Sequence, residues 1–179
     1  MMGFPSWAEA GPDRRAHVER VAGLVREWAE RMKIPPAERE RWLRAVYLHD
    51  ALRDAPAETL KRFAADRWHS PVLLHGPAAA ACAAEHGEND RGVLDAVRYH
   101  SVGYAGWDRA GQILYLADYL EPGRTFREQE RQEMARRVPA ELSSVLQDVA
   151  RERLRWIVDS GWVLLPETVD FWNALTRGS

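Results

Sequence analysis

Cysteines and long apolar runs are both scarce in this chain. Cys82 is the single cysteine among 179 residues, so no disulfide can form within the chain, and a reducing compartment is expected. Its alanine-rich surroundings indicate a small buried side chain. No stretch approaches the ~20 apolar residues of a transmembrane helix, and the first residues lack the basic and apolar segments of a signal peptide. We therefore expect a cytoplasmic protein.

Lysine is nearly absent as well. Only Lys33 and Lys61 are lysines, so arginine supplies almost all of the 25 basic side chains. The planar guanidinium group suits phosphate oxygens. The formal net charge is −2, which argues against electrostatic binding to nucleic acid or to a membrane surface. An anionic substrate must therefore meet a local group of arginines.

The sequence contains no useful strand-like alternation, no internal repeat and no low-complexity linker. Apolar residues recur at helical spacing between prolines and glycines, which predicts an all-α protein. The length and the 46% apolar content suit one folded domain. We expect a single helical bundle over residues 1–179, with a metal-binding core over about 13–124 and C-terminal helices over about 125–176.

Capping residues and prolines locate several helix ends. Asp13 is expected to cap the first helix, and Asn89-Asp90 and Asp108 are expected to cap later ones. Pro139 is expected to open a long amphipathic helix, preceded by a solvated, charged face over 127–137. Most of the eight tryptophans are expected in the core. The tryptophan-rich C-terminal helices can alternatively form a dimer interface, so monomer and homodimer both stay open.

Four of the six histidines lie beside segments that should be buried. These are His17, His49, His75 and His100. One buried histidine is more often a hydrogen-bonded core residue than a ligand, because buried polar groups need partners. Four of them on different helices indicate a shared metal centre, since neutral imidazole is a common metal ligand. His69 and His86 lie at segment ends and are expected to be exposed or to cap helices.

Two aspartates accompany these histidines. Asp50 directly follows His49, and Asp118 interrupts the apolar run Ile-Leu-Tyr-Leu-Ala-Asp-Tyr-Leu. A buried carboxylate is costly unless it meets a cation. Because a carboxylate has two oxygens, Asp50 is the natural bridge between two metal ions. We expect one ion at His17, His49 and Asp118, and the other at His75 and His100.

These residues resemble, in their order, the HD superfamily of metal-dependent phosphohydrolases. The resemblance is closer to its YqeK-type branch, the symmetrical diadenosine tetraphosphate hydrolases, and spans roughly residues 14–175. It rests on the segments LHDALRD at 48–54, LLHGPAAA at 73–80, RYHSVGYAGW at 98–107, LYLADYLEPGRTF at 114–126 and PETVDFWN at 166–173.

The resemblance implies an HD-type helical bundle with a di-metal centre at its core. It also implies hydrolysis of diadenosine tetraphosphate, or a related dinucleoside polyphosphate, to two ADP by a metal-activated hydroxide. The two divalent ions are usually iron in this branch, although manganese or another transition metal suits the same ligand types. The expected ligands are His17, His49, Asp50, His75, His100 and Asp118.

Further residues are expected to act on the substrate. Arg53 stands where the branch usually has lysine, and Ser101 stands where it usually has threonine. We expect Asp50 and Arg53 to be catalytic. The expected substrate-binding residues are Arg53, Ser101, Glu121 and Arg124, and Glu121 is expected to hold Arg124 in place. A surface ion pair is the alternative role for Arg53, and a structural pair with Glu121 is the alternative for Arg124.

Three other functions fit parts of this pattern. Another HD nucleotide phosphohydrolase or nucleotidase would use the same six ligands. A di-iron HD oxygenase, which oxidises a cyclitol with molecular oxygen, would share the scaffold, but the LADYLEPGR segment resembles the hydrolase branch. A non-catalytic nucleotide-binding domain is the third alternative, and a full set of metal ligands argues against it.

Overall fold

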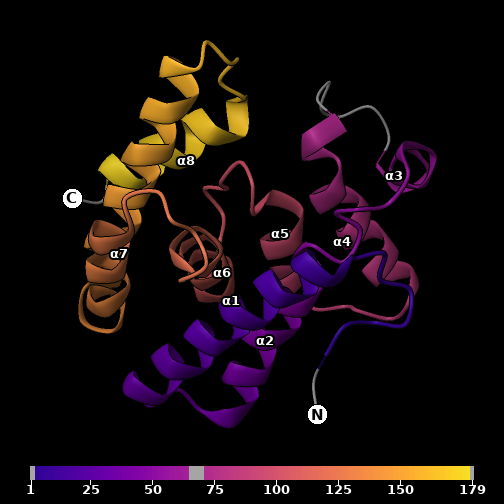
Figure 1. Cartoon of the computed structure of the whole chain (residues 1–179), viewed down its shortest axis with the longest axis horizontal. Coiled ribbons are helices and arrows are strands. Elements are labelled where there is room, and N and C mark those ends of the chain that lie inside the picture. Colours follow the sequence, from indigo (N-terminus) through magenta and orange to yellow (C-terminus); the bar gives the residue numbers. More distant parts are fainter. Residues whose placement is uncertain (1–2, 65–70, 178–179) are drawn as a thin grey trace.

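The computed structural model of the chain describes residues 3–64 and 71–177, and their regular structure is entirely helical (Figure 1). The all-α prediction is therefore confirmed. The elements in chain order are α1 (Pro12–Arg31), α2 (Pro36–His49), α3 (Ala57–Phe63), the short 3-10 turn η1 (Pro71–Leu73), α4 (His75–Glu85), α5 (Arg91–Tyr99), α6 (Arg109–Leu120), α7 (Glu128–Asp159) and α8 (Pro166–Arg177). No helix in these two ranges is long and apolar enough to cross a membrane.

Helices α2 and α6 form the middle of the bundle. Each of them packs against α1 and α5, and they also contact each other. Their inward faces are apolar, and Val46 of α2 and Ile113 of α6 are completely buried. Helix α7 covers the other side of α6, and α8 folds back against α7 at the edge of the molecule (Figure 1). Buried polar residues also lie in this interior, among them His49 at the end of α2, His75 at the start of α4 and His100 directly after α5.

An arginine of α2 joins the starts of α5 and α6. Asp90 caps α5 by accepting a hydrogen bond from the Val93 amide at 3.2 Å, and Asp108 caps α6 through the Ala110 amide at 2.9 Å. Both caps were predicted. Arg41 donates to Asp108 and, at 3.0 Å, to Asp90. This shared ion pair fixes three helices relative to one another, which nothing in the local sequence predicts.

The expected cap of the first helix is wrong. Gly11 is the N-cap, Pro12 occupies the first helical position, and Asp13 lies in the first turn. Proline suits that position because its φ is already helical and its missing N–H would have no helical partner. The Gly11 amide instead donates to Asp54 at 2.9 Å. The Asp13 carboxylate lies near the positive end of the helix dipole, where a negative charge is stabilising.

Helix α7 begins at Glu128, eleven residues before the expected start at Pro139. Pro139 lies inside it, and the backbone leaves helical geometry at Glu141 (φ −131°, ψ 38°), so the helix is kinked. The expectation of a solvated face over 127–137 is wrong for one side of this segment. Arg131 is buried there, with its guanidinium carbon 4.3 Å from the centre of the Tyr119 ring.

The tryptophans that the structure describes include both buried and exposed ones, and Trp68 lies outside the described residues. Trp28, Trp42 and Trp107 are buried, as expected. Trp156 and Trp162 are 56% and 55% exposed and contact each other near the turn between α7 and α8, with ring centres 4.9 Å apart. The core assignment is wrong for this pair. The choice between monomer and homodimer stays a prediction.

The Asp90 cap gives a prediction about stability. Asp90→Ala should lower the free energy of unfolding by about 1–2 kcal/mol near neutral pH, because it removes the α5 cap and an acceptor of Arg41. Hydrogen bonds from Arg41 lower the pKa of Asp90. The loss should therefore be complete above the unfolded-state pKa of roughly 4 and should shrink as the pH falls through the lower folded value.

Urea unfolding at pH 7 and at pH 3 measures this difference, and Asp13→Ala is the control, since Asp13 makes no capping hydrogen bond. An equal loss of stability at both pH values would contradict the assigned role of the carboxylate.

Candidate metal centre

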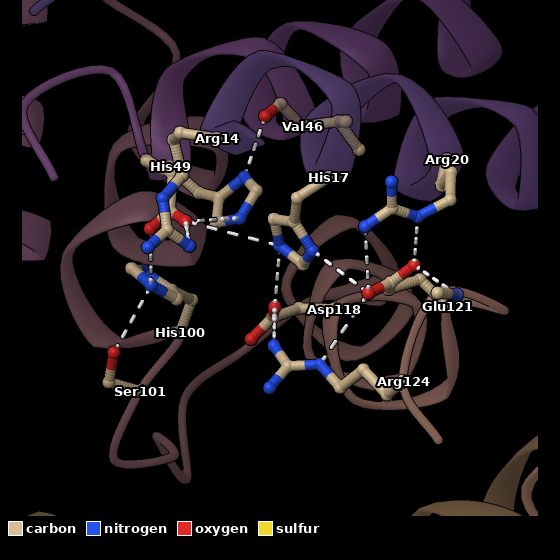
Figure 2. Close-up of polar contacts among 12 residues, drawn as sticks. Arg14, His17, Arg20, Val46, His49, His100, Ser101, Asp118, Glu121 and Arg124 are labelled. Atoms are coloured by element: carbon tan, nitrogen blue, oxygen red, sulfur yellow. Dashed lines mark hydrogen bonds and ion pairs between the residues drawn. The ribbon is translucent and has the colours of Figure 1, made fainter. Parts of the chain in front are cut away.

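Six buried residues meet in the interior of the bundle, and none is more than 9% exposed. Figure 2 shows four of them, His17, His49, His100 and Asp118. The six residues come from α1, the end of α2, the start of α4, the end of α5 and α6. They are the six residues expected as ligands, namely His17, His49, Asp50, His75, His100 and Asp118. The structure thus brings together residues that are separated by up to 101 positions in the sequence.

Three of the four histidines are oriented in the same way. Nδ1 of each ring lies near the backbone carbonyl oxygen three residues earlier, at 2.7 Å for His49 and at 2.8 Å for both His75 and His100. A carbonyl oxygen only accepts hydrogen bonds, so Nδ1 must carry the proton. In the neutral ring, Nε2 then presents a lone pair to the centre, as metal-ligating histidines do.

His17 is held by a carboxylate in place of a carbonyl. Its Nδ1 lies 3.2 Å from Glu121 Oε1, and its Nε2 lies 3.1 Å from Asp118 Oδ1. Burial lowers the pKa of His17, but Asp118 and Glu121 outweigh burial and raise it to about 9. Burial raises the pKa of Glu121, yet hydrogen bonds from His17 and Arg20 bring it to about 2. Glu121 is therefore a carboxylate at neutral pH.

Asp50 lies between two pairs of histidines. Its Oδ1 is 3.2 Å from His75 Nε2 and 3.7 Å from His100 Nε2, whereas its Oδ2 is 3.9 Å from His17 Nε2 and 3.7 Å from His49 Nε2. Burial raises the pKa of Asp50, but the surrounding imidazoles hold it well below its usual range. One ionised carboxylate thus offers one oxygen to each histidine pair.

The donor set fits two cations. The Nε2 atoms of His75 and His100 are 3.0 Å apart, and two lone pairs at that distance repel each other unless a cation or a proton lies between them. Nε2 of His49 is buried and has no hydrogen-bond partner among the described residues. Two groups of three candidate ligands each have donor atoms within 4.8 Å of one another, and Asp50 belongs to both. Imidazole and carboxylate donors suit several transition metals, so they do not select one.

A family model described as the HD domain matches residues 14–123. The chain belongs to the HD domain family. The resemblance inferred from the sequence is thereby confirmed, and all six clustered residues lie within the matched part. Helices α7 and α8 lie beyond it.

Two bacterial enzymes are similar to the chain in sequence. The chain is 28% identical to the symmetrical bis(5'-nucleosyl)-tetraphosphatase of Bacillus subtilis, over 93% of this chain and 91% of that protein. It is 44% identical to the enzyme of the same name from Staphylococcus aureus over 54 residues, 30% of this chain and 28% of that one.

A crystal structure from Clostridium acetobutylicum, described as a predicted HD superfamily hydrolase involved in NAD metabolism, superposes with a TM-score of 0.81. The match covers 94% of this chain and 92% of that one at 24% identity, which establishes a shared fold.

Beside the HD centre, Glu121 organises two arginines. Arg124 Nη2 lies 3.1 Å from Asp118 Oδ1, and Arg124 Nε lies 3.7 Å from Glu121 Oε1. Arg20 Nε approaches Glu121 Oε2 more closely, at 2.6 Å. Glu121 thus contacts Arg124, as expected from the sequence, while its closer partners are Arg20 and His17. The Arg124 side chain is 46% exposed, which leaves one side of it open to a ligand.

Arg14 was not expected at the site. Its Nη1 lies 2.8 Å from Asp50 Oδ2, and the signal that could have identified it is its position one helical turn before His17. Arg53, by contrast, is half-buried, and in the described ranges its side chain forms no hydrogen bond or ion pair with the cluster. Ser101 Oγ lies 3.1 Å from His100 Nε2, so its hydroxyl is beside the centre.

The remaining two histidines are not in the cluster. His86 is exposed at the end of α4, where its Nδ1 lies 2.8 Å from the Cys82 carbonyl oxygen. This agrees with the expected helix-end position. Cys82 is buried, as expected. His69 lies outside the described residues.

Asp50→Ala should abolish binding of both metal ions, because the variant removes the carboxylate that faces both histidine pairs. The α-helical fold should remain, since Asp50 lies at the end of α2 and not within the apolar core. Metal analysis by mass spectrometry and circular dichroism measure the two properties. Asp54→Asn is the control on the same segment, because its amide oxygen can still accept from Gly11. Two bound ions in the Asp50 variant would contradict the proposed bridge.

Glu121→Gln should weaken metal binding at His17 by about 10–100-fold while keeping the side-chain volume. The amide cannot match the charged acceptor that fixes the His17 ring and its Nδ1 proton. Competition with a chromophoric chelator measures the affinity. Glu128→Gln, an exposed change at the start of α7, is the control. Equal affinity in the Glu121 variant and the wild type would exclude this role.

Proposed function

We propose that this HD protein hydrolyses diadenosine tetraphosphate and related dinucleoside polyphosphates symmetrically to two ADP, at a centre of two divalent ions. The observation that carries the proposal is Asp50, whose two oxygens each face one histidine pair. The similarity to the Bacillus subtilis symmetrical tetraphosphatase over most of both chains supports this choice of substrate. Iron is the proposed metal, and manganese or another transition metal suits the same donors.

The proposed ligands are the six clustered residues, with Asp50 as the bridge. When bound, two such ions act as Lewis acids toward a phosphate oxygen and lower the pKa of water toward neutrality. The histidine rings need no reorganisation for this role, because each Nδ1 is already held by a carbonyl or by Glu121. Burial of the cluster keeps bulk water from competing with these interactions.

Arginines around the centre are proposed to bind the phosphate groups. The guanidinium group of Arg14 forms an ion pair with Asp50, and that of Arg124 forms one with Asp118. The two arginine side chains are 27% and 46% exposed, respectively. Both side chains therefore reach from the buried cluster toward solvent, where a polyphosphate chain can approach. Negative charge that grows on the phosphate oxygens during cleavage would be stabilised by these fixed cations.

Arg53 and Ser101 are kept in the proposal with the roles expected from the sequence. Arg53 supplies charge near Asp50, and the Ser101 hydroxyl offers a hydrogen bond beside His100. The cytoplasmic location and the absence of nucleic-acid and membrane partners also stay predictions.

Product analysis tests the proposal directly. The chain is purified without oxygen, loaded with iron(II) and incubated with diadenosine tetraphosphate, and the nucleotides are separated by ion-exchange chromatography. ADP should be the sole product, and the Asp50→Ala variant should form none. AMP together with ATP would contradict symmetric cleavage. No turnover by protein that holds two ions would direct the search to another phosphorylated nucleotide, and oxygen consumption with a polyol would favour an oxygenase.

A further inference from the structure

Two side chains of the C-terminal helices bind the backbone that follows His100. Arg153 of α7 donates from Nη2 to the Ser101 carbonyl oxygen at 2.7 Å. Thr168 of α8 donates from Oγ1 to the Val102 carbonyl oxygen at 2.8 Å, in a buried position. These two carbonyls belong to the first residues after α5, where the helix no longer supplies donors. The C-terminal helices therefore hold the chain directly beyond a proposed metal ligand.

The next residue of this segment is held by packing. Gly103 has a φ of +89°, and a Cβ atom at this position would lie 2.4 Å from Cδ1 of Phe171. Phe171 is buried and packs its ring against Tyr115 and Trp107, with ring centres 5.3 Å and 5.2 Å away. Glycine is needed here both for the left-handed conformation and for the close approach of α8. Residues 101–103 are thus held consecutively by α7 and α8.

Arg153 is itself fixed by α6. Its guanidinium carbon lies 4.8 Å from the centre of the Tyr115 ring and 5.9 Å from that of Tyr119. These rings are one helical turn apart and form a platform on which the cation is attracted to the aromatic faces. The donor that reaches Ser101 therefore has a defined direction, and it connects α6 and α7 with the end of α5.

We propose that Arg153 and Thr168 are positioning residues that fix the backbone after His100, and so set the metal affinity of the His75–His100 half of the centre. This inference rests on the two-ion centre of the proposed function. His100 caps α5, so a shift of the following peptide turns the residue and moves Nε2. Metal sites tolerate displacements of only about 0.5 Å in their ligands.

Loss of these hydrogen bonds should lower the metal affinity of the His75–His100 half more than that of the other half. Within the described ranges, Arg153 and Thr168 form side-chain hydrogen bonds only with the segment after His100. The contact of Arg153 with the ring of Tyr119, the residue next to Asp118, is looser, with 5.9 Å between the guanidinium carbon and the ring centre. A role limited to packing α7 and α8 onto the bundle would lower thermal stability without changing one metal site more than the other.

Metal titration tests this inference without any substrate. Wild type and variants, stripped of metal, are titrated with manganese(II) and followed by calorimetry. Arg153→Met keeps an extended chain over Tyr115 but cannot donate, and Thr168→Val keeps the shape but loses the hydroxyl. In both variants one ion should bind as in the wild type, and the other should bind about 10–100-fold more weakly.

Conservative variants and a surface change provide the controls. Arg153→Lys and Thr168→Ser retain a donor and should recover much of the lost affinity. Arg155→Met alters an exposed arginine on the same helix and should change neither affinity. In a His100→Ala background, where the same half is already damaged, Arg153→Met should have no further effect on metal binding.

Several results would overturn the inference. They are unchanged affinities in Arg153→Met, equal weakening of both ions, or an undiminished effect in the His100→Ala background. A wild-type chain that binds fewer than two ions would overturn the two-ion centre and this inference with it. Hydrolysis is measured separately, and its absence in protein with normal two-ion binding would contradict only the choice of substrate.

Discussion

A buried carboxylate surrounded by imidazoles is the constraint on which the rest of the structure depends. Asp50 is 3% exposed, and removing its charge from water costs several kcal/mol unless cations compensate. Four imidazole nitrogens and the Arg14 guanidinium approach its two oxygens. No single helix can provide these groups, because neighbouring residues of a helix point in different directions. The bundle must therefore bring several helices to one point, which the apolar faces of α2 and α6 achieve.

The ends of the helices, more than their middles, build this point. His49 is the last residue of α2, Asp50 follows it, His75 begins α4 and His100 caps α5. The last carbonyl groups of a helix have no partner within the helix. At the ends of α2 and α5 these carbonyls accept the Nδ1 protons of His49 and His100. One hydrogen bond thus satisfies a buried carbonyl and also turns Nε2 toward the centre.

This arrangement explains which parts could be predicted from the sequence. A polar residue in an apolar run is unusual, so Asp118 and the histidines were recognisable, and Asp90 was recognisable because capping is a local interaction. Arg41 was not, since its partners lie 49 and 67 positions away. Arg131 looked like part of a solvated charged run, because sequence alone cannot show that Tyr119 packs beneath it. The expected division into a metal-binding core that ends near residue 124 and a set of C-terminal helices stays a prediction. The roles expected of Arg53 and Arg124 toward the substrate also stay predictions.

The positions of the proposed ligands in their helices also differ between the two halves of the centre. His17 lies inside α1, where helical hydrogen bonds fix the backbone on both sides, and Asp118 lies in the last turn of α6. His100 has helical support on one side only, because the chain then enters the segment 101–107. A rigid ligand at a helix end needs a second support, and here it comes from α7 and α8, beyond the matched HD domain. The HD core supplies all six proposed ligands, but in our proposal the precise position of His100 depends on α7 and α8, which contribute none of them.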